Sequence, residues 1–383
     1  MRVALVHDYL REYGGAERVL ETLHEMFPDA PVYTAYFNPQ GLGSHAAEIS
    51  KWDIRSSALQ KVPFARKLVS PFRLFAPMIF EGFDLREYDL VISSCAIYFA
   101  KAVITSPSTL HLSYIHTPPR YLYGYTTSFN YKKNPLTRVL GELANHILRV
   151  FDYETSQRPD VLIANSENVA ARIRKFYRRE PVIIYPPVDV SEISRQSSVV
   201  RKSESSRLKA DSYYLSLSRL VRGKGVDVVI KACNQAKVNL KVAGTGPEAK
   251  YLKSISGPTI EFVGEVTDEE RVKLYAGAKA LILASEDEDF GITAVEAQAA
   301  GTPVIAPRSG GYLETIIEGK TGVFYEVAID KSQESSLVQT LQSFDPAKFK
   351  AEDCQKQAEK FSKERFKEKM LELIKSNLKS QIF

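Results

Sequence analysis

The part of this sequence with the most chemistry is an acidic stretch that holds two glutamates eight residues apart, Glu288 and Glu296. Between them, four residues lead into a helical pattern: Phe290, Gly291, Ile292 and Thr293. A helix that begins near Ile292 would direct its first N–H groups at a diphosphate, and Gly291 would permit a close approach. Glu296 could then accept hydrogen bonds from a ribose diol, and Glu288 from sugar hydroxyls. The block predicts a nucleotide-sugar site; the alternative is a surface loop with ordinary acids.

Positive charge for that diphosphate is available from Arg219 and Lys224, which follow an apolar run in a glycine-containing turn. An arginine fork and a lysine point charge can together replace a metal ion at a diphosphate. Asp287 and Asp289 offer the alternative, because a D-x-D pattern can chelate a divalent cation. We expect the protein cations to suffice, and therefore expect no metal and no other cofactor.

Two further turns contain pairs of glycines, Gly14 with Gly15 and Gly244 with Gly246. Each follows an apolar run and would allow a ligand to approach the backbone closely. Neither completes a G-x-G-x-x-G, so dinucleotide binding is not supported, and each is equally well explained as a plain strand-to-helix turn. His116 follows the apolar run 111–115 and precedes two prolines that fix its loop. Ligand-facing residues of α/β domains collect at such strand ends, which favours a functional over a structural histidine.

These residues must be held by strands, and apolar runs of strand length alternate with helical patterns along the chain. In the first half the runs are 3–6, 90–93, 111–115, 161–164 and 182–185; in the second half they are 213–218, 240–243, 260–263, 280–284 and 304–306. This alternation is typical of βαβ units and parallel sheets, so we expect two α/β, doubly wound domains.

The serine-rich and charged stretch 191–210 separates the two halves and predicts a loop or linker. We therefore expect an N-terminal domain over 1–188 and a C-terminal domain over 189–359. Apolar residues at near-helical spacing predict an amphipathic helix over 360–379. This last segment, 360–383, is expected to pack back towards the N-terminal domain.

Composition excludes several classes of protein. The chain has 383 residues, 44% hydrophobic and 25% charged, as in globular proteins, and its net charge of +5 is low for a nucleic-acid enzyme. Three widely spaced cysteines give no disulfide or metal pattern and favour the cytosol. The N-terminus is interpreted as a first strand and not a signal peptide, and no run reaches the ~18 apolar residues of a membrane span.

One basic and aromatic run extends from Arg55 to Phe80. It contains five basic residues and no acidic one, interleaved with apolar side chains: Arg55, Lys61, Arg66, Lys67 and Arg73. The pattern is typical of a helix that lies on an anionic bilayer, although a solvated helix packed on its own domain would also fit.

Taken together, the motifs resemble those of the retaining glycosyltransferases of family 4, over nearly the whole chain. The resemblance rests on GGAER (14–18), YIHTPPRYLY (114–123), IANSENVAARI (163–173), VIIYPPVDV (182–190), SRLVRGKG (218–225), VAGTGPE (242–248), FVGEVTDEE (262–270), the Glu288-to-Glu296 block and AGTPVIA. Among these enzymes, the YIHTPPRY stretch is most similar to mannosyltransferases of O-antigen and exopolysaccharide assembly.

The resemblance implies a GT-B fold, with two facing Rossmann-like domains and the reaction in the cleft between them. It implies that Arg219 and Lys224 hold the diphosphate, Glu296 the ribose, and Glu288 with the amides of 290–293 the transferred sugar. His116 would face the anomeric centre, and the Gly14-Gly15 loop would line the acceptor side. Many relatives have Glu-Gly-Phe-Gly where this chain has Asp289 in second place.

The implied reaction is hexose transfer with retention, with GDP-mannose as the donor and a lipid-linked saccharide or glycolipid as the acceptor. The enzyme would be cytoplasmic and bound to the inner face of the cell membrane through the run from Arg55 to Phe80, with no nucleic acid as partner. Alternatives are a UDP-sugar transferase of the same fold, a sugar-nucleotide epimerase and a non-catalytic nucleotide-sugar-binding protein.

Overall fold

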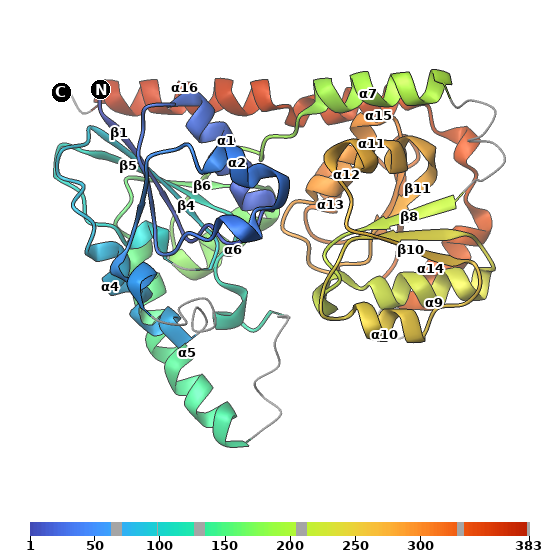
Figure 1. Cartoon of the computed structure of the whole chain (residues 1–383), viewed down its shortest axis with the longest axis horizontal. Helices are drawn as coiled ribbons and strands as arrows, with labels where there is room; N and C mark the ends of the chain where they lie inside the picture. The colour runs from blue at the N-terminus through green and yellow to red at the C-terminus, as the bar shows by residue number, and fades with distance from the viewer. Residues whose placement is uncertain (63–70, 98, 126–134, 204–212, 328–332, 381–383) are drawn as a thin grey trace. The chain divides into compact units, whose positions relative to one another are not determined.

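The computed structural model describes residues 1–62, 71–97, 99–125, 135–203, 213–327 and 333–380. The chain divides into two compact units (Figure 1). Unit 1 combines Met1–Pro187 with Phe366–Phe383, and unit 2 is Val188–Arg365. The chain therefore enters unit 2 at Val188 and returns to unit 1 within its last helix.

Unit 1 contains a parallel sheet that has seven strands among the residues described. In spatial order these are β3 (Ile54–Ser56), β2 (Val32–Thr34), β1 (Val3–His7), β4 (Leu90–Cys95), β5 (Leu110–Ile115), β6 (Val161–Ala164) and β7 (Val182–Ile183). Since β1 and β4 are neighbours, the strand order reverses between them. A doubly wound sheet binds ligands at such a reversal, beyond the carboxyl ends of its strands.

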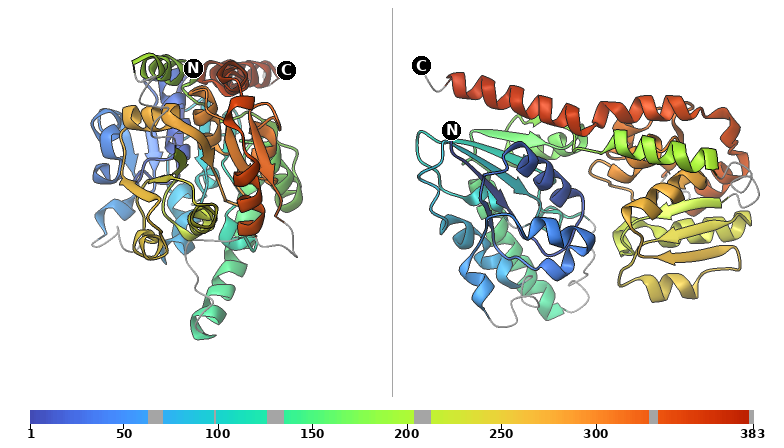
Figure 2. Two further views of the ribbon diagram at one scale, coloured as in Figure 1. Left: turned by 90° about the vertical axis from the view of Figure 1, so that its right-hand side faces the viewer. Right: turned by 45° about the horizontal axis from the view of Figure 1, so that its top comes forward.

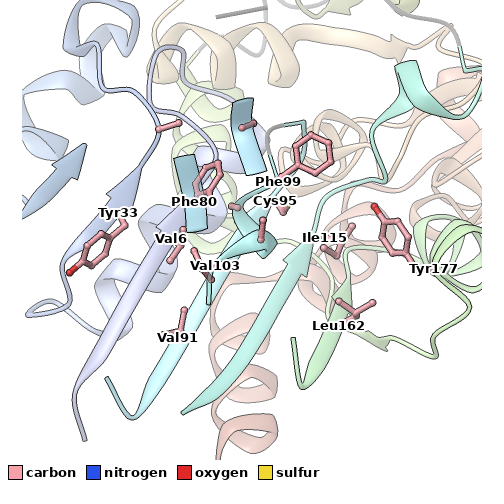
Figure 3. Packing of buried hydrophobic residues seen from close by; sticks show 14 of the residues in the cluster. Val6, Tyr33, Phe80, Val91, Cys95, Phe99, Val103, Ile115, Leu162 and Tyr177 are labelled. Carbon is pink, nitrogen blue, oxygen red and sulfur yellow. The ribbon is translucent and has the colours of Figure 1, made fainter. Parts of the chain in front are cut away.

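Both faces of this sheet are buried because successive side chains of a strand point to opposite sides. Val6 and Val91 belong to one core, with Phe80 and Tyr177 from the covering segments (Figure 3). Leu5 and its neighbours belong to the second core on the opposite face. The helices of unit 1 are α1 (Gly15–Met26), α2 (Ala46–Ile49), α4 (Ala76–Glu81), α5 (Pro135–Ser156), α6 (Glu167–Tyr177) and most of α16 (Lys363–Ser380).

The C-terminal helix α16 packs into the second core of unit 1. Phe366, Met370 and Ile374 are spaced four residues apart, so they form one face of the helix, and each is buried. The ring of Phe366 meets the ring of Tyr114 edge to face at 5.9 Å between centroids. The helix expected over 360–379 is thus present, and its apolar face is part of the core.

Unit 2 contains a second parallel sheet, with six strands among the described residues. In spatial order they are β10 (Ile260–Gly264), β9 (Leu240–Ala243), β8 (Tyr213–Leu217), β11 (Ala278–Ile282), β12 (Val304–Pro307) and β13 (Gly322–Tyr325). Figure 1 shows helices on both sides of it. They are α7 (Val190–Ser203), α9 (Val226–Ala236), α10 (Ala249–Ser254), α11 (Asp268–Gly277), α12 (Ile292–Ala299), α13 (Tyr312–Thr315), α14 (Gln333–Ser343) and α15 (Ala351–Ala358). The expected α/β class with two doubly wound parallel sheets is confirmed.

The prediction of a linker over 191–210 is wrong for the part that the structure describes, since Val190–Ser203 forms α7. Two of its serines face the unit and stand where apolar residues would ordinarily be: Ser197 is fully buried, and the Ser194 hydroxyl donates to the Ala299 carbonyl at 2.9 Å. A small hydroxyl residue lets α7 approach α11 and α12 closely. Serine at buried positions concealed the helical period, and residues 204–210 lie outside the described residues.

Three short strands were not predicted: β2, β3 and β13. Each has only three or four residues. Alternation cannot be recognised over so few positions.

The single interfacial helix expected from Arg55 to Phe80 is also not formed over the described residues. Arg55 lies in the edge strand β3, Ala58–Lys61 and Pro71–Phe75 are 3₁₀ turns, and α4 begins at Ala76. The Arg55 guanidinium is held by the Asp53 carboxylate and the Tyr33 and Tyr88 hydroxyls. Residues 63–70, with Arg66 and Lys67, lie outside the described residues.

In the part of the chain that the structure describes, no helix has the length and apolar character needed to cross a bilayer. The three cysteines are free and buried. Burial raises the pKa of each thiol, Cys95, Cys233 and Cys354, to about 12.

We predict that Phe366→Ala lowers the free energy of unfolding of unit 1 by about 3–5 kcal/mol, because it leaves a cavity between α16 and Tyr114. The only tryptophan, Trp52, packs against the same core, so its fluorescence in guanidinium reports the unfolding of unit 1. Leu371→Ala is the control on the same helix, since that side chain is 41% exposed. Equal loss of stability in both variants would contradict the packing of α16 described above.

Candidate functional site

In unit 2, the strand order reverses between the neighbouring strands β8 and β11. The loop after β8 carries Arg219 and Lys224, and the loop after β11 carries Glu288. Because the carboxyl ends of parallel strands lie at one edge of a sheet, these three side chains come from adjacent loops there. The sequence-predicted donor residues of unit 2 thus gather at its switch point.

Lys224 and Glu288 form a direct ion pair at this edge. The lysine Nζ donates to both carboxylate oxygens, at 3.0 Å to Oε1 and 2.7 Å to Oε2. Both side chains are only partly exposed, at 30% and 18%. The sequence analysis assigned Lys224 to the diphosphate and Glu288 to the transferred sugar. In the structure the two side chains also neutralise each other's charge.

Helix α12 begins beside this pair, as predicted, at Ile292. Its N-cap is Gly291, whose φ of +93° is in the left-handed region that favours glycine. Phe290 is buried and its ring packs edge to face on Phe361, which fixes the chain just before the helix. The first turn of a helix leaves N–H groups without partners in the helix, and here those groups belong to half-buried Ile292 and Thr293.

The Gly244–Gly246 turn supports the loop that carries Arg219. Gly244 has a φ of +121°, and a Cβ built on it would lie 2.0 Å from the Ser218 carbonyl oxygen. The Leu220 amide donates to the Thr245 carbonyl at 2.8 Å, which holds the two loops together. Glycine is needed here because the backbones of the two loops touch. Contact of Gly244 or Gly246 with a nucleotide-sugar donor stays a prediction.

Glu296 lies inside α12 and is 1% exposed. One carboxylate oxygen accepts a hydrogen bond from the Tyr275 hydroxyl at 2.9 Å, and the other lies 3.5 Å from the Arg271 guanidinium. These contacts tie α12 to α11. The Glu296 carboxylate therefore already has protein partners in the structure. The ribose contact assigned to it stays a prediction.

Asp287 and Asp289 flank Glu288 in the same loop and are partly buried. The Gly311 amide donates to the Glu288 carbonyl at 2.9 Å, so the acidic loop is fixed by the segment that follows β12. Across the described stretches of the chain, no three His, Cys, Asp or Glu side chains are grouped so that they could hold a metal ion.

In unit 1, His116 ends a chain of buried polar side chains at the carboxyl ends of β1, β4 and β5. Its Nε2 lies 2.8 Å from the Ser94 hydroxyl, which lies 3.0 Å from Nδ1 of His7. Nε2 of His7 lies 3.5 Å from the Glu17 carboxylate, in the first turn of α1. All four side chains are no more than 9% exposed.

Proton positions in this chain are coupled. The Ser94 hydroxyl has one hydrogen, so it can donate to only one imidazole, and the other imidazole must donate to its oxygen. Burial lowers the pKa of His116 to about 3, and charge on His7 adds to the lowering. His116 is therefore neutral at physiological pH, and its tautomer depends on that of His7.

The loops around this chain are fixed by backbone contacts. The buried Asp8 carboxylate accepts hydrogen bonds from the Ala96, Ile97 and Ala100 amides, at 2.6–2.9 Å. Gly14 is the N-cap of α1, with extended backbone, and Gly15 is the first residue of the helix. The two glycines therefore start the helix that carries Glu17.

Sequence reasoning missed His7, Asp8 and Ser94. His7 and Asp8 follow the first predicted strand, 3–6, and Ser94 follows the second, 90–93, so the strand-end rule that selected His116 applied equally to them. Their partnership joins residues 87 apart in the chain, which spacing alone does not reveal.

Several known proteins are similar to this chain. A GDP-mannose-dependent alpha-mannosyltransferase of Corynebacterium glutamicum is 36% identical over 111 residues, which are 29% of this chain and 27% of that protein. A D-inositol 3-phosphate glycosyltransferase of Corynebacterium urealyticum is 27% identical over 254 residues, which are 60% of this chain and 59% of that protein. The chain thus spans less than two thirds of either relative.

Similarity to solved structures extends over the whole fold. Anabaena HepE, solved in complex with UDP and glucose, is 19% identical with a TM-score of 0.67, and the match covers 98% of this chain and 100% of that one. The described units therefore have the GT-B fold of that protein.

Family models match both halves of the chain. Residues 13–192 match Glycosyltransferase Family 4, and residues 201–377 match Glycosyl transferases group 1. Together they leave only short stretches unmatched, and the chain belongs to the group 1 glycosyltransferases that carry a family 4 N-terminal half.

Proposed function

We propose that this chain is a retaining glycosyltransferase that moves a hexose from a nucleotide sugar to a hydroxyl of a lipid-linked saccharide or glycolipid. The observation that carries the proposal is the Lys224–Glu288 pair beside the N-terminus of α12, at the switch point of unit 2. A cation and helix N–H groups suit a diphosphate, and a carboxylate suits sugar hydroxyls.

The reaction breaks the bond between the sugar and the diphosphate, and negative charge then grows on the departing oxygen. Fixed positive groups near that oxygen lower the barrier most, and Arg219, Lys224 and the amides of α12 are the candidates. An acceptor hydroxyl enters on the face that the diphosphate leaves, and the departing oxygen takes its proton. No side chain has to form a covalent bond to the sugar.

The proposed donor is GDP-mannose. The name of the Corynebacterium glutamicum relative supports it, while the UDP and glucose bound to Anabaena HepE keep a UDP-sugar as the alternative.

His116 is proposed to face the anomeric centre, with the Gly14-Gly15 loop on the acceptor side. Neutral imidazole suits this position, because it can accept or donate a hydrogen bond without placing a positive charge beside an oxocarbenium-like sugar. The acceptor would be reached at the cytoplasmic face of the cell membrane.

The proposal is tested with purified protein, GDP- and UDP-sugars and a lipid-linked saccharide. Transfer of the sugar to the acceptor is the expected result. An epimerase would instead change the sugar without an acceptor, and a non-catalytic protein would bind the donor without turnover.

We predict that Lys224→Ala lowers transfer a hundredfold or more, about 2.7–4 kcal/mol of transition-state stabilisation. Glu288→Ala should lower transfer to a similar extent and leave the affinity for the free nucleoside diphosphate equal or higher, because the carboxylate that engages Lys224 is gone. Glu296→Ala should mainly weaken nucleotide binding. Calorimetry with GDP and UDP separates binding from turnover, and near-normal turnover by Lys224→Ala would exclude its diphosphate role.

Transfer is also predicted to survive chelation, because Arg219, Lys224 and the α12 amides supply the positive charge. The measurement is the initial rate before and after EDTA, with magnesium or manganese added back. Complete loss that either ion restores would assign the diphosphate contact to a metal held by Asp287 and Asp289.

A third prediction concerns Ser94. Ser94→Ala should lower transfer about 10- to 100-fold, the size of loss seen when a group that orients a metal-ligating histidine is removed. Because the pKa of His116 is held near 3 by burial, its imidazole NMR signals should not titrate between pH 5 and 8 in the parent protein, and the variant should change its ring nitrogen shifts.

Ser93→Ala is the matched control. Ser93 is equally buried and lies on the same strand, but its hydroxyl pairs with His111 and Ser113. Equal loss of transfer in both variants, with unchanged His116 spectra, would show that the Ser94 bridge only stabilises the fold.

A further inference from the structure

The long helix α5 exposes an apolar face that nothing in the described part of unit 1 covers. Five of its side chains are 41–68% exposed: Val139, Leu143, Ile147, Val150 and Phe151. Their spacing of three, four and eight places them on one side of the helix. His146 is the polar side chain on this face between Val139 and Phe151.

This orientation of α5 is fixed by its opposite side. Asn145, Leu148 and Asp152 are buried there, and Leu148 lies in the core of unit 1. The Asp152 carboxylate pairs with fully buried Lys101 at 2.5 Å and accepts hydrogen bonds from the Tyr123 and Tyr177 hydroxyls. Rotating α5 to hide its apolar face would break this network, so the exposure is a stable feature of the fold.

A second group of exposed apolar side chains lies nearby on the 3₁₀ turn Pro71–Phe75 and on α4. Leu74, Phe75 and Met78 are 43–68% exposed. Both α4 and α5 pack on the turn Ala100–Ala102 and on the same core of unit 1 (Figures 1 and 2). The Arg73 guanidinium lies over the Tyr121 ring, in a turn that α5 also contacts.

We propose that the α5 face inserts into the surface of a phospholipid bilayer. An apolar face about three and a half turns long, with Phe151 at one end and exposed Glu154 beyond it, suits the boundary between headgroups and acyl chains. This inference rests on the proposed lipid-linked acceptor, whose saccharide must be reached from the membrane surface.

A second copy of the chain suits the face less well. Five side chains at about half exposure, each at most about 200 Å², offer about 500 Å² on α5, against the roughly 800 Å² that each partner buries in a standard interface. Such an interface also carries about one hydrogen bond per 100–200 Å², and this face offers a single polar side chain.

Helix α5 also contacts the loops that carry the candidate site of unit 1. The Arg149 guanidinium of α5 donates to the Leu122 carbonyl at 3.0 Å, in the turn that follows His116. Lys101, the partner of Asp152, follows the loop that Asp8 holds. Contact of α5 with a membrane would therefore bring the His116 loop to the membrane surface.

The basic run from Arg55 to Phe80 predicts a different mode of binding, driven by charge. Among its described residues, Arg55 is engaged by Asp53 and two tyrosines, and Arg73 stacks on Tyr121. Binding through the α5 face should instead be driven by apolar insertion, and so should resist salt and extend to neutral lipid.

The experiment is flotation of the full chain with phosphatidylcholine vesicles, with and without phosphatidylglycerol, at low and high salt and without any substrate. The parent protein should bind both kinds of vesicle, and high salt should not release it. The double variant Leu143→Ser/Ile147→Ser should reduce the partition coefficient at least about tenfold.

The matched control is Leu313→Ser/Ile317→Ser in unit 2, which also changes two exposed residues four apart, 52% and 39% exposed, and should bind as the parent does. Binding that the α5 variant retains, or that requires phosphatidylglycerol and low salt, would overturn the proposal. A dimer in analytical ultracentrifugation that the α5 variant abolishes, without vesicle binding, would overturn it in favour of a second copy. Donor hydrolysis, measured separately without vesicles, tests the proposed function, so the two can fail independently.

Discussion

When helices cover both faces of a parallel sheet, its strands can present polar side chains to a ligand only at the ends of the strands. Both units of this chain obey that constraint. In unit 1 the carboxyl ends of β1, β4 and β5 carry His7, Ser94 and His116, and in unit 2 the loops after β8 and β11 carry Lys224 and Glu288. The chemistry of the protein is concentrated where the hydrophobic layers end.

The candidate sites at the strand ends of the two units differ in how their charges are held. Unit 2 holds a cation and a carboxylate in direct contact, and both remain partly open to solvent. Unit 1 buries its polar chain almost completely and keeps His116 neutral. A diphosphate requires charges that can exchange partners, whereas a histidine beside a developing sugar cation benefits from having no positive charge. The contrast agrees with the division of roles between donor grip and reaction centre that is proposed for the two halves.

The extent to which sequence predicts this structure depends on how far apart the interacting residues are. Continuous apolar runs of four residues, such as 3–6 and 161–164, predicted strands correctly, because burial on both faces requires continuous apolar sequence. The start of α12 near Ile292 was predicted from the helical pattern that follows Phe290 and Gly291. Serine at buried positions of α7 hid a helix, and three-residue strands such as β2 carry too little pattern to be recognised. Contacts across the sheet, such as His7 with Ser94 or Lys224 with Glu288, follow from topology and could not be predicted from spacing.

The three cysteines have a practical consequence. Each is buried and its thiol has a pKa near 12, so almost none is present as the reactive thiolate at neutral pH. The native chain should therefore be nearly inert to maleimides and other thiol reagents while it is folded. A single cysteine introduced at an exposed position would then be the only reactive thiol, and the protein can carry one spectroscopic label at a chosen place without removal of its own cysteines.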